Sequence, residues 1–107
     1  MTKLSELHDA QINMMVCKKL GLGLSSYTRI ITVDDATILL DDNKTLVDYC
    51  NNWSDAGPII VEHRINIEWH EWKNGIFRPY ALNNETMKSC YDTNPLRAAM
   101  IVFLEMQ

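Results

Sequence analysis

Basic residues, cysteine motifs and long hydrophobic runs are scarce in this 107-residue sequence. Ten Lys and Arg against fourteen Asp and Glu give a net charge of −4, so a broad face that neutralises phosphates is not expected. No apolar stretch approaches the length needed to cross a bilayer, and no signal-like run follows the N-terminus. These absences favour a cytoplasmic protein with no membrane partner, and they disfavour nucleic acid as a partner.

The cysteines are too few and too scattered for a disulfide framework or a zinc site. Cys17, Cys50 and Cys90 form an odd set without C-x-x-C spacing, which predicts free thiols in a reducing compartment. The three histidines show no ligand spacing on one element, so we expect neither a metal nor another cofactor. The sequence also lacks a phosphate loop, a dinucleotide fingerprint and a nucleophile elbow. The absence of these motifs disfavours an enzymatic function.

Length and composition indicate one globular domain covering residues 1–107, since 47% of the residues are hydrophobic and 22% charged. A first helix is predicted within residues 4–23, capped by Ser5 or His8 and ended at Gly21 or Gly23. Its main apolar stripe consists of Leu7, Ala10, Met14 and Cys17, and Ile12, Val16 and Leu20 widen this stripe.

Residues 27–33 and 36–40 are rich in β-branched side chains and predict two strands that meet at Asp34–Asp35. Residues 41–51 are polar without a clear period, and we interpret them as a loop.

The stretch "CNNWSDAGPIIVEH", residues 50–63, is typical of a helix start. Ser54 is the expected cap, Asp55 suits the first turn, and Pro58 would be the fourth helical residue. The helix should continue to about Arg64. This interpretation leaves Cys50, Asn51 and Asn52 unexplained.

Residues 65–82 predict a β-hairpin, because Asn74–Gly75 suits a type I′ turn. A two-residue loop would place Trp72 opposite Phe77 and Trp69 opposite Tyr80. In that register His70, Trp72 and Phe77 share one face, and the core face consists of Ile65, Ile67, Trp69, Tyr80 and Leu82.

Residues 83–93 read as a polar connection, and Asn94 with Pro95 then opens a last helix that is apolar nearly all round. Such a helix is either sandwiched within the domain or buried against a partner. The predicted fold class is therefore α+β, an antiparallel four-stranded sheet with three helices in the order α-ββ-α-ββ-α.

Arg97 is the most informative charge, because a cation in the first turn of a helix opposes the dipole. We expect Asp55 to compensate it as a structural pair that joins two helix starts. The alternative is a ligand or anion site formed by Asn51, Asn52, Asp55 and Arg97.

His70, Trp72 and Phe77, with Lys73 and Arg78 nearby, suggest an aromatic surface on which bases or sugars could stack. Cross-strand stabilisation of the hairpin, or a cover supplied by another helix or subunit, is the favoured interpretation.

Two segments, "CNNWSDAGPIIVEHRINI" and "NPLRAAMIVFLEMQ", resemble the NinX-like proteins of lambdoid phages and prophages. The opening helix is also similar, whereas residues 24–49 match poorly. Trp53 and Gly57 stand where the family pattern has a proline and a tryptophan. The resemblance implies a phage or prophage accessory protein with an α-β-α sandwich-like domain in a bacterial cytoplasm, and it implies no reaction.

Together these features favour a non-enzymatic module that binds a protein partner or forms a homodimer, on account of the apolar last helix and six methionines. A ligand-binding or anion-binding domain is the alternative. A single-stranded nucleic-acid contact through residues 65–82 is a weaker one.

Overall fold

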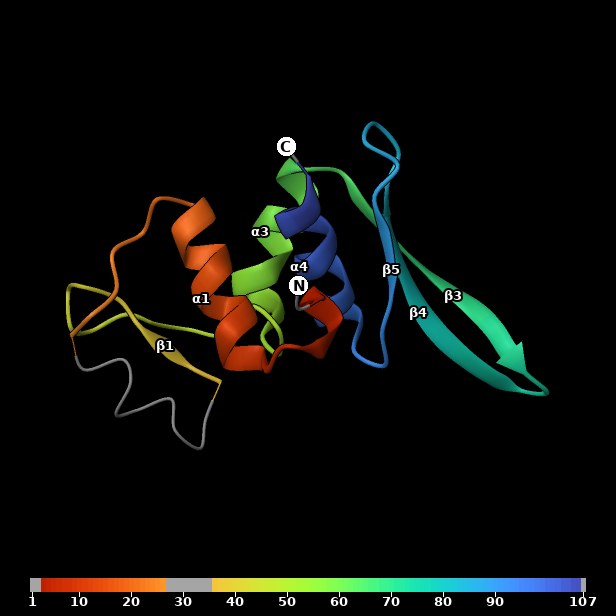
Figure 1. The fold of residues 1–107 in the computed structure, drawn as a ribbon, viewed down its shortest axis with the longest axis horizontal. Helices are drawn as coiled ribbons and strands as arrows, with labels where there is room; N and C mark the ends of the chain where they lie inside the picture. Colours follow the sequence, from red (N-terminus) through yellow and green to blue (C-terminus); the bar gives the residue numbers. More distant parts are fainter. Residues whose placement is uncertain (1–2, 27–35, 107) are drawn as a thin grey trace.

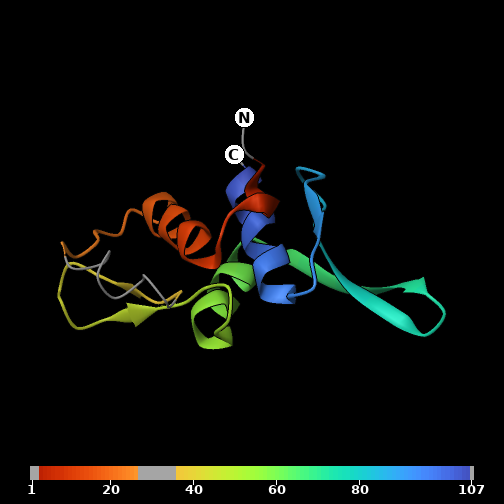
Figure 2. The same ribbon diagram turned by 60° about the horizontal axis from the view of Figure 1, so that its bottom comes forward.

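The computed structural model describes residues 3–26 and 36–106. In it, a helical body carries a long β-hairpin that projects from one side (Figures 1 and 2). The elements are a 3-10 turn η1 (Leu4–Glu6), helix α1 (Asp9–Lys19), strands β1 (Ile38–Leu39) and β2 (Leu46–Val47), helix α3 (Trp53–Glu62), strands β3 (Ile65–Lys73), β4 (Ile76–Asn83) and β5 (Ser89–Tyr91), and helix α4 (Pro95–Glu105). The α+β class is confirmed. A single four-stranded sheet is not found, because the strands form a two-stranded sheet β1-β2 and a three-stranded sheet β3-β4-β5, both antiparallel.

The small sheet arises where the sequence predicted only a loop. The predicted strand over residues 36–40 is confirmed in part as β1, whereas the one over 27–33 lies outside the described residues. Residues 41–51 contain β2, which pairs with β1 through Ile38 and Val47. The chain reverses there because the Asp42 carboxylate accepts hydrogen bonds from the amides of Lys44 and Thr45, both at 2.8 Å. Such an Asp side-chain turn can be recognised from sequence, but within residues 41–51 it was read only as part of a polar loop.

Helix α1 begins later than residue 4 and buries part of the predicted stripe. His8 is its N-cap residue, and Gln11 Oε1 accepts from the His8 amide at 2.9 Å. Gly21, with φ of 77°, follows the helix end in the left-handed conformation. The buried residues of α1 are Ile12, Asn13, Val16 and Cys17. Three of them belong to the predicted stripe, whereas Leu7 and Met14 are only partly buried and Asn13 was not predicted.

Helix α3 is capped by Asn52, not by Ser54. The Asn52 side chain accepts from the Ser54 amide at 2.8 Å, so the helix starts at Trp53. Pro58 is consequently the sixth helical residue, and it deprives the Ser54 carbonyl of its usual partner. The helix ends at Glu62, because Arg64 takes a left-handed φ of 52°.

The β3–β4 hairpin forms as predicted, but its register differs by one residue. Lys73 pairs with Ile76 as expected, and a bulge at Trp72 then places Phe77 opposite Glu71 and Pro79 opposite Trp69. The turn is not type I′, since Gly75 has a positive φ and Asn74 does not. The slip exchanges the two faces of β4 while leaving those of β3 unchanged.

One face of the three-stranded sheet packs against α4, and the other is open. Strand alternation places Ile65, Ile67 and Ala81 on the inner face, where Ile65 and Ala81 join the core with α4. Figure 1 shows that β3 and β4 continue well beyond the reach of α4. The free end of the hairpin is hereafter the arm (residues 68–80). On its inner face Pro79 is still buried, whereas Trp69 and Phe77 are exposed.

Helix α4 is confirmed with Asn94 as its cap, and it lies inside the domain. The Asn94 side chain accepts from the amides of Leu96 and Arg97. The predicted connection over residues 83–93 is wrong in part, because Ser89–Tyr91 form β5 at the sheet edge. Helix α4 is enclosed by α1, α3 and the sheet, so its buried residues cover nearly its whole circumference: Leu96, Ala98, Ala99, Met100, Ile101, Val102 and Phe103.

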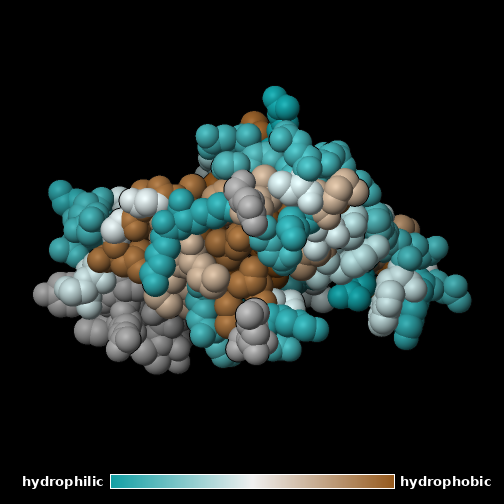
Figure 3. All heavy atoms as spheres, turned by 45° about the horizontal axis from the view of Figure 1, so that its top comes forward, coloured by the Kyte–Doolittle hydropathy of each residue, from teal (hydrophilic) through white to brown (hydrophobic). Residues whose placement is uncertain are grey.

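Hydrophobic residues accordingly gather over the body (Figure 3). The arm is pale to teal in this view, because tryptophan and tyrosine lie near the middle of the hydropathy scale.

We expect Ile101→Glu to lower the free energy of unfolding by about 4 kcal/mol or more, since a charge would be buried without a partner. Ile101 is 2% exposed, whereas Val61 on α3 is 78% exposed. The control Val61→Glu should change stability by less than about 0.5 kcal/mol. Urea unfolding followed by circular dichroism measures both. A folded Ile101→Glu variant with unchanged stability would contradict the central position of α4.

Candidate functional site

The unexplained Cys50–Asn52 segment lies at a junction between the N-terminal region and the starts of α3 and α4. Asn51 Nδ2 donates to Asp9 at 3.2 Å and to Asp48 at 3.1 Å. Asn94 Nδ2 donates to the Cys50 carbonyl at 2.7 Å and to Asn51 Oδ1 at 3.1 Å. The segment thus connects three parts of the chain that are distant in sequence.

Arg97 lies at the same junction, but its partner is not Asp55. Its guanidinium contacts Asp9 Oδ1 at 2.7 Å and Asp92 Oδ2 at 3.1 Å. The same group donates to the carbonyls of Ser5 and Leu7. Burial alone would lower the pKa of Arg97, but the hydrogen bonds and charges of Asp9 and Asp92 outweigh it and raise that pKa.

The four residues predicted to bind a ligand have separate roles in this geometry. Asn51 and Arg97 both contact Asp9. Asn52 caps α3, and the Asp55 carboxylate accepts from the Asp48 amide at 2.9 Å. These contacts explain all four residues structurally, and ligand binding by them stays a prediction.

Asn13, which was not predicted as a functional or structural site residue, is fully buried at the centre of this network. Asn13 Nδ2 donates to Asp48 at 2.8 Å and to the Ala36 carbonyl at 2.9 Å, and its Oδ1 accepts from the Cys50 amide. An amide within the apolar side of α1 was the available signal. Among the described residues, no buried side-chain nitrogen or oxygen lacks a partner.

We expect Arg97→Met to lower the free energy of unfolding by about 3–5 kcal/mol, because two carboxylates and two carbonyls lose their donor. The Arg97 side chain is 12% exposed. Arg64→Met is the matched control: its contact with Glu85 spans 3.9 Å between exposed side chains, so the cost should stay below about 1 kcal/mol. Equal costs in guanidinium unfolding would contradict the role of Arg97.

Cys50 is not a reactive thiol. Burial, and then the charge of Asp9, raises the pKa of Cys50 to about 12. Burial and the charge of Asp92 raise the pKa of the half-buried Cys90 to about 11. Both thiols therefore stay protonated at neutral pH, and a protonated thiol is a poor nucleophile.

We expect the folded protein to react with a thiol reagent such as DTNB at pH 8 far more slowly than the unfolded chain. All three cysteines, Cys17 included, are free thiols, and Cys17 and Cys50 are buried. Absorbance should report fewer than one reacted thiol within minutes in buffer, and three in 6 M guanidinium. Prompt reaction of Cys50 in the native state would contradict its burial.

The second candidate site is the outer face of the arm, the face away from α4. His70 Nδ1 and the Tyr91 hydroxyl are 2.6 Å apart, and His70 Nε2 lies 2.8 Å from Glu68. The rings of His70 and Tyr80 stack with centroids 4.6 Å apart, and Tyr80 lies 4.5 Å from Tyr91. Hydrogen bonds and ring contacts together hold these aromatic side chains in fixed positions.

Trp72 extends this outer face toward the hairpin tip, whereas Phe77 does not. A cavity of about 240 Å³ is lined by His70, Glu71, Trp72, Arg78 and Tyr91. Phe77 lies opposite Glu71 and alternates with Arg78, so it faces the inner side together with Trp69. The structure thus brings together His70 and Trp72 of the predicted aromatic surface and separates Phe77 from them.

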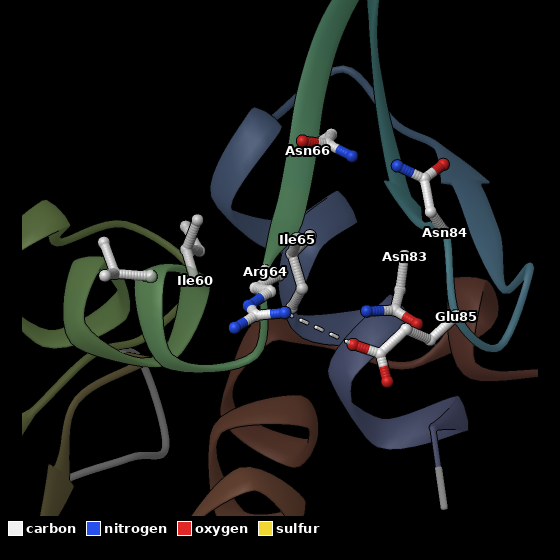
Figure 4. A pocket seen from close by; sticks show the side chains of 8 residues that line it. Ile60, Arg64, Ile65, Asn66, Asn83, Asn84 and Glu85 are labelled. Atoms are coloured by element: carbon white, nitrogen blue, oxygen red, sulfur yellow. Dashed lines mark ion pairs between the residues drawn. The ribbon is translucent and has the colours of Figure 1, made fainter.

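A larger open hollow of about 610 Å³ lies at the base of the hairpin, between the end of α3 and the start of β3. Figure 4 shows Asn66 and Asn84 beside it, with Arg64 and Glu85 near its rim. Asn66 alternates with Ile65 and therefore shares the outer face with Glu68 and His70.

Neither a metal site nor a membrane span is found in the part of the chain that the structure describes. No three His, Cys, Asp or Glu side chains there are grouped to hold a metal. No helix in residues 3–26 and 36–106 combines the length and hydrophobicity needed to cross a bilayer.

Comparison with known proteins identifies a family. The family model described as "Bacteriophage P22, NinX" matches residues 3–107. No curated protein matches the chain. No solved structure matches it either.

Proposed function

Because this chain belongs to the NinX family of bacteriophage P22, we propose that it is a non-enzymatic phage accessory protein that acts as a protein-interaction module. Its working surface is the inner face of the arm, and the occupant of that face is the arm of a second copy. Exposure of Trp69 and Phe77 beyond α4 is the observation that carries this proposal.

The inner face of the arm continues the surface that the core uses. Pro79 on this face is buried, but the aromatic side chains beside it stay largely exposed in the described monomer. Ile65 is buried at the base of β3, whereas Trp69 is 58% and Phe77 54% exposed. Two exposed aromatic side chains next to each other on a projecting hairpin are typical of an interface anchor. Helix α4, by contrast, is buried in the core of the described monomer and has no exposed apolar face for a partner.

Charge favours a second copy as the occupant. Residues 65–82 carry Glu68, Glu71, Lys73 and Arg78 and are neutral, so the net charge of −4 falls on the rest of the chain. Two bodies repel each other, whereas two arms do not. A two-fold arrangement would place the same aromatic pair on both sides of the contact.

Packing through the face is better supported than pairing through the edge. No described strand pairs with the outer edge of β3, so that edge is available in principle. However, the bulge at Trp72 and the charged residues Glu71 and Lys73 interrupt it, and these features protect natural edge strands from pairing.

We expect the wild type to dimerise at micromolar concentration. The double variant Trp69→Ala, Phe77→Ala should have a dimer dissociation constant at least about a hundredfold higher, because replacing an aromatic interface anchor by alanine weakens binding by about 2 kcal/mol or more. Sedimentation equilibrium between about 1 and 200 µM measures both.

The matched control is Val61→Ala, Met87→Ala, which removes two exposed apolar side chains outside the arm. It should leave the dimer intact. A wild type that stays monomeric at 200 µM, or a control that dissociates equally, would overturn the proposal.

The ligand-binding alternative at Asn51, Asn52, Asp55 and Arg97 is weaker. Two carboxylates already neutralise Arg97, and an anion would have to displace one of them.

A further inference from the structure

The outer face of the arm combines aromatic rings with cations that have no carboxylate partner. The Lys73 ammonium lies 4.5 Å from the Trp72 ring centroid, and the Arg78 guanidinium lies 5.5 Å from it. Arg78 is also 5.8 Å from the Tyr91 ring. Neither cation forms an ion pair with any residue in 3–26 or 36–106, unlike Arg64 and Arg97. Both charges are therefore free to meet an anion.

The rings on this face are held in place before any ligand arrives. Tyr91 is fixed by the 2.6 Å hydrogen bond to His70, and His70 is fixed in turn by Glu68. Tyr91 remains 47% exposed despite its contacts, and Trp72 is 56% exposed. Ordered rings that stay accessible bind a planar ligand with little loss of side-chain entropy.

The outer face of β3 runs from the cavity at Trp72 to Asn66, which borders the larger hollow (Figure 4). The rest of that hollow is lined by the end of α3, by Ile65 and Asn83 of the inner face, and by Asn84 and Glu85. Six residues of strand separate Trp72 from Asn66, a length of roughly 20 Å. Between Trp72 and Asn66 the outer face carries the rings of His70 and Tyr80 and the carboxylate of Glu68. An extended ligand would therefore meet rings over the part of the path nearest Trp72.

We propose that this face binds single-stranded nucleic acid. One base stacks on the exposed ring of Trp72 in place of the Arg78 guanidinium, which lies over that ring without ligand, and the flanking phosphates contact Arg78 and Lys73. The strand then follows β3 toward the larger hollow, where the amides of Asn66 and Asn84 donate and accept hydrogen bonds with base edges.

Phosphate and base together explain the arrangement better than a protein ligand does. Cations beside aromatic rings are the combination that single-strand binders use, and base stacking tolerates any sequence. The net charge of −4 and the nearby Glu68 and Glu71 oppose a polyanion, so the affinity is modest and stacking contributes most of it. This site is on the opposite side of the arm from Trp69 and Phe77, and its occupancy does not depend on dimer formation.

The test is fluorescence anisotropy of a labelled 12-residue oligothymidylate with the full chain at 20 mM salt. We expect saturable binding that Trp72→Ala weakens by at least about fivefold, the lower bound for loss of one stacked base. If Arg78 and Lys73 neutralise two phosphates, a tenfold rise in salt concentration should weaken wild-type binding about 25-fold. Arg78→Gln should roughly halve the slope of the logarithm of the binding constant against the logarithm of the salt concentration.

Trp69→Ala is the matched control, because Trp69 is on the same strand with nearly equal exposure but faces the other side. It should leave oligonucleotide binding unchanged while it weakens the dimer, and Trp72→Ala should do the reverse. Thymidine monophosphate should compete poorly. Absence of binding at 100 µM protein, equal losses for both tryptophan variants, or a mononucleotide that binds as tightly as the oligomer would each overturn the proposal.

Discussion

The ion pairs of Arg97 are the interaction on which the arrangement of this fold depends. A cation in the first turn of a helix is unfavourable by itself, and Arg97 lies there on the most buried of the described helices. Asp92 satisfies it from the segment just before the helix, and Asp9 satisfies it from the start of α1. Because Asp9 and the carbonyls of Ser5 and Leu7 belong to the N-terminal region, three of the four partners of Arg97 are in place only when that region is docked.

The other end of α4 is fixed by the same kind of long-range contact. Lys19, at the end of α1, donates to the carbonyls of Phe103 and Met106, where a cation suits the helix dipole. Burial lowers the pKa of Lys19. Helix α1 thus binds both ends of α4 through charged groups, and the apolar residues between them fill the core. With α4 fully used inside the body, contacts with other molecules depend on the parts that project from it.

Local signals in the sequence identified the elements that depend on local chemistry. Asn94 with Pro95 fixed the start of α4, and Asn74–Gly75 located the hairpin. Asn and Ser side chains can both cap a helix. Ser54 was predicted as the N-cap of α3, and Asn52, two residues earlier, has that role in the structure. The partner of Arg97 could not be predicted for a different reason. Asp9 is 88 positions away in sequence, and hydrophobic periodicity does not indicate which distant carboxylate lies next to Arg97 in the fold. The buried network around Asn13 is a consequence of the same docking.

The bulge at Trp72 shows how a single residue decides the chemistry of the arm. In an unbroken two-residue hairpin, Phe77 would share a face with His70 and Trp72, and Tyr80 would face the core with Trp69. The one-residue slip reverses β4 alone: Phe77 joins Trp69 on the inner face, while Arg78 and Tyr80 join His70 on the outer face. Apolar aromatic surface is thereby separated from cationic aromatic surface on opposite sides of one two-stranded ribbon. In a regular hairpin Arg78 would share the core face with Trp69 and Tyr80, so the bulge is what moves this cation to the side of His70 and Trp72.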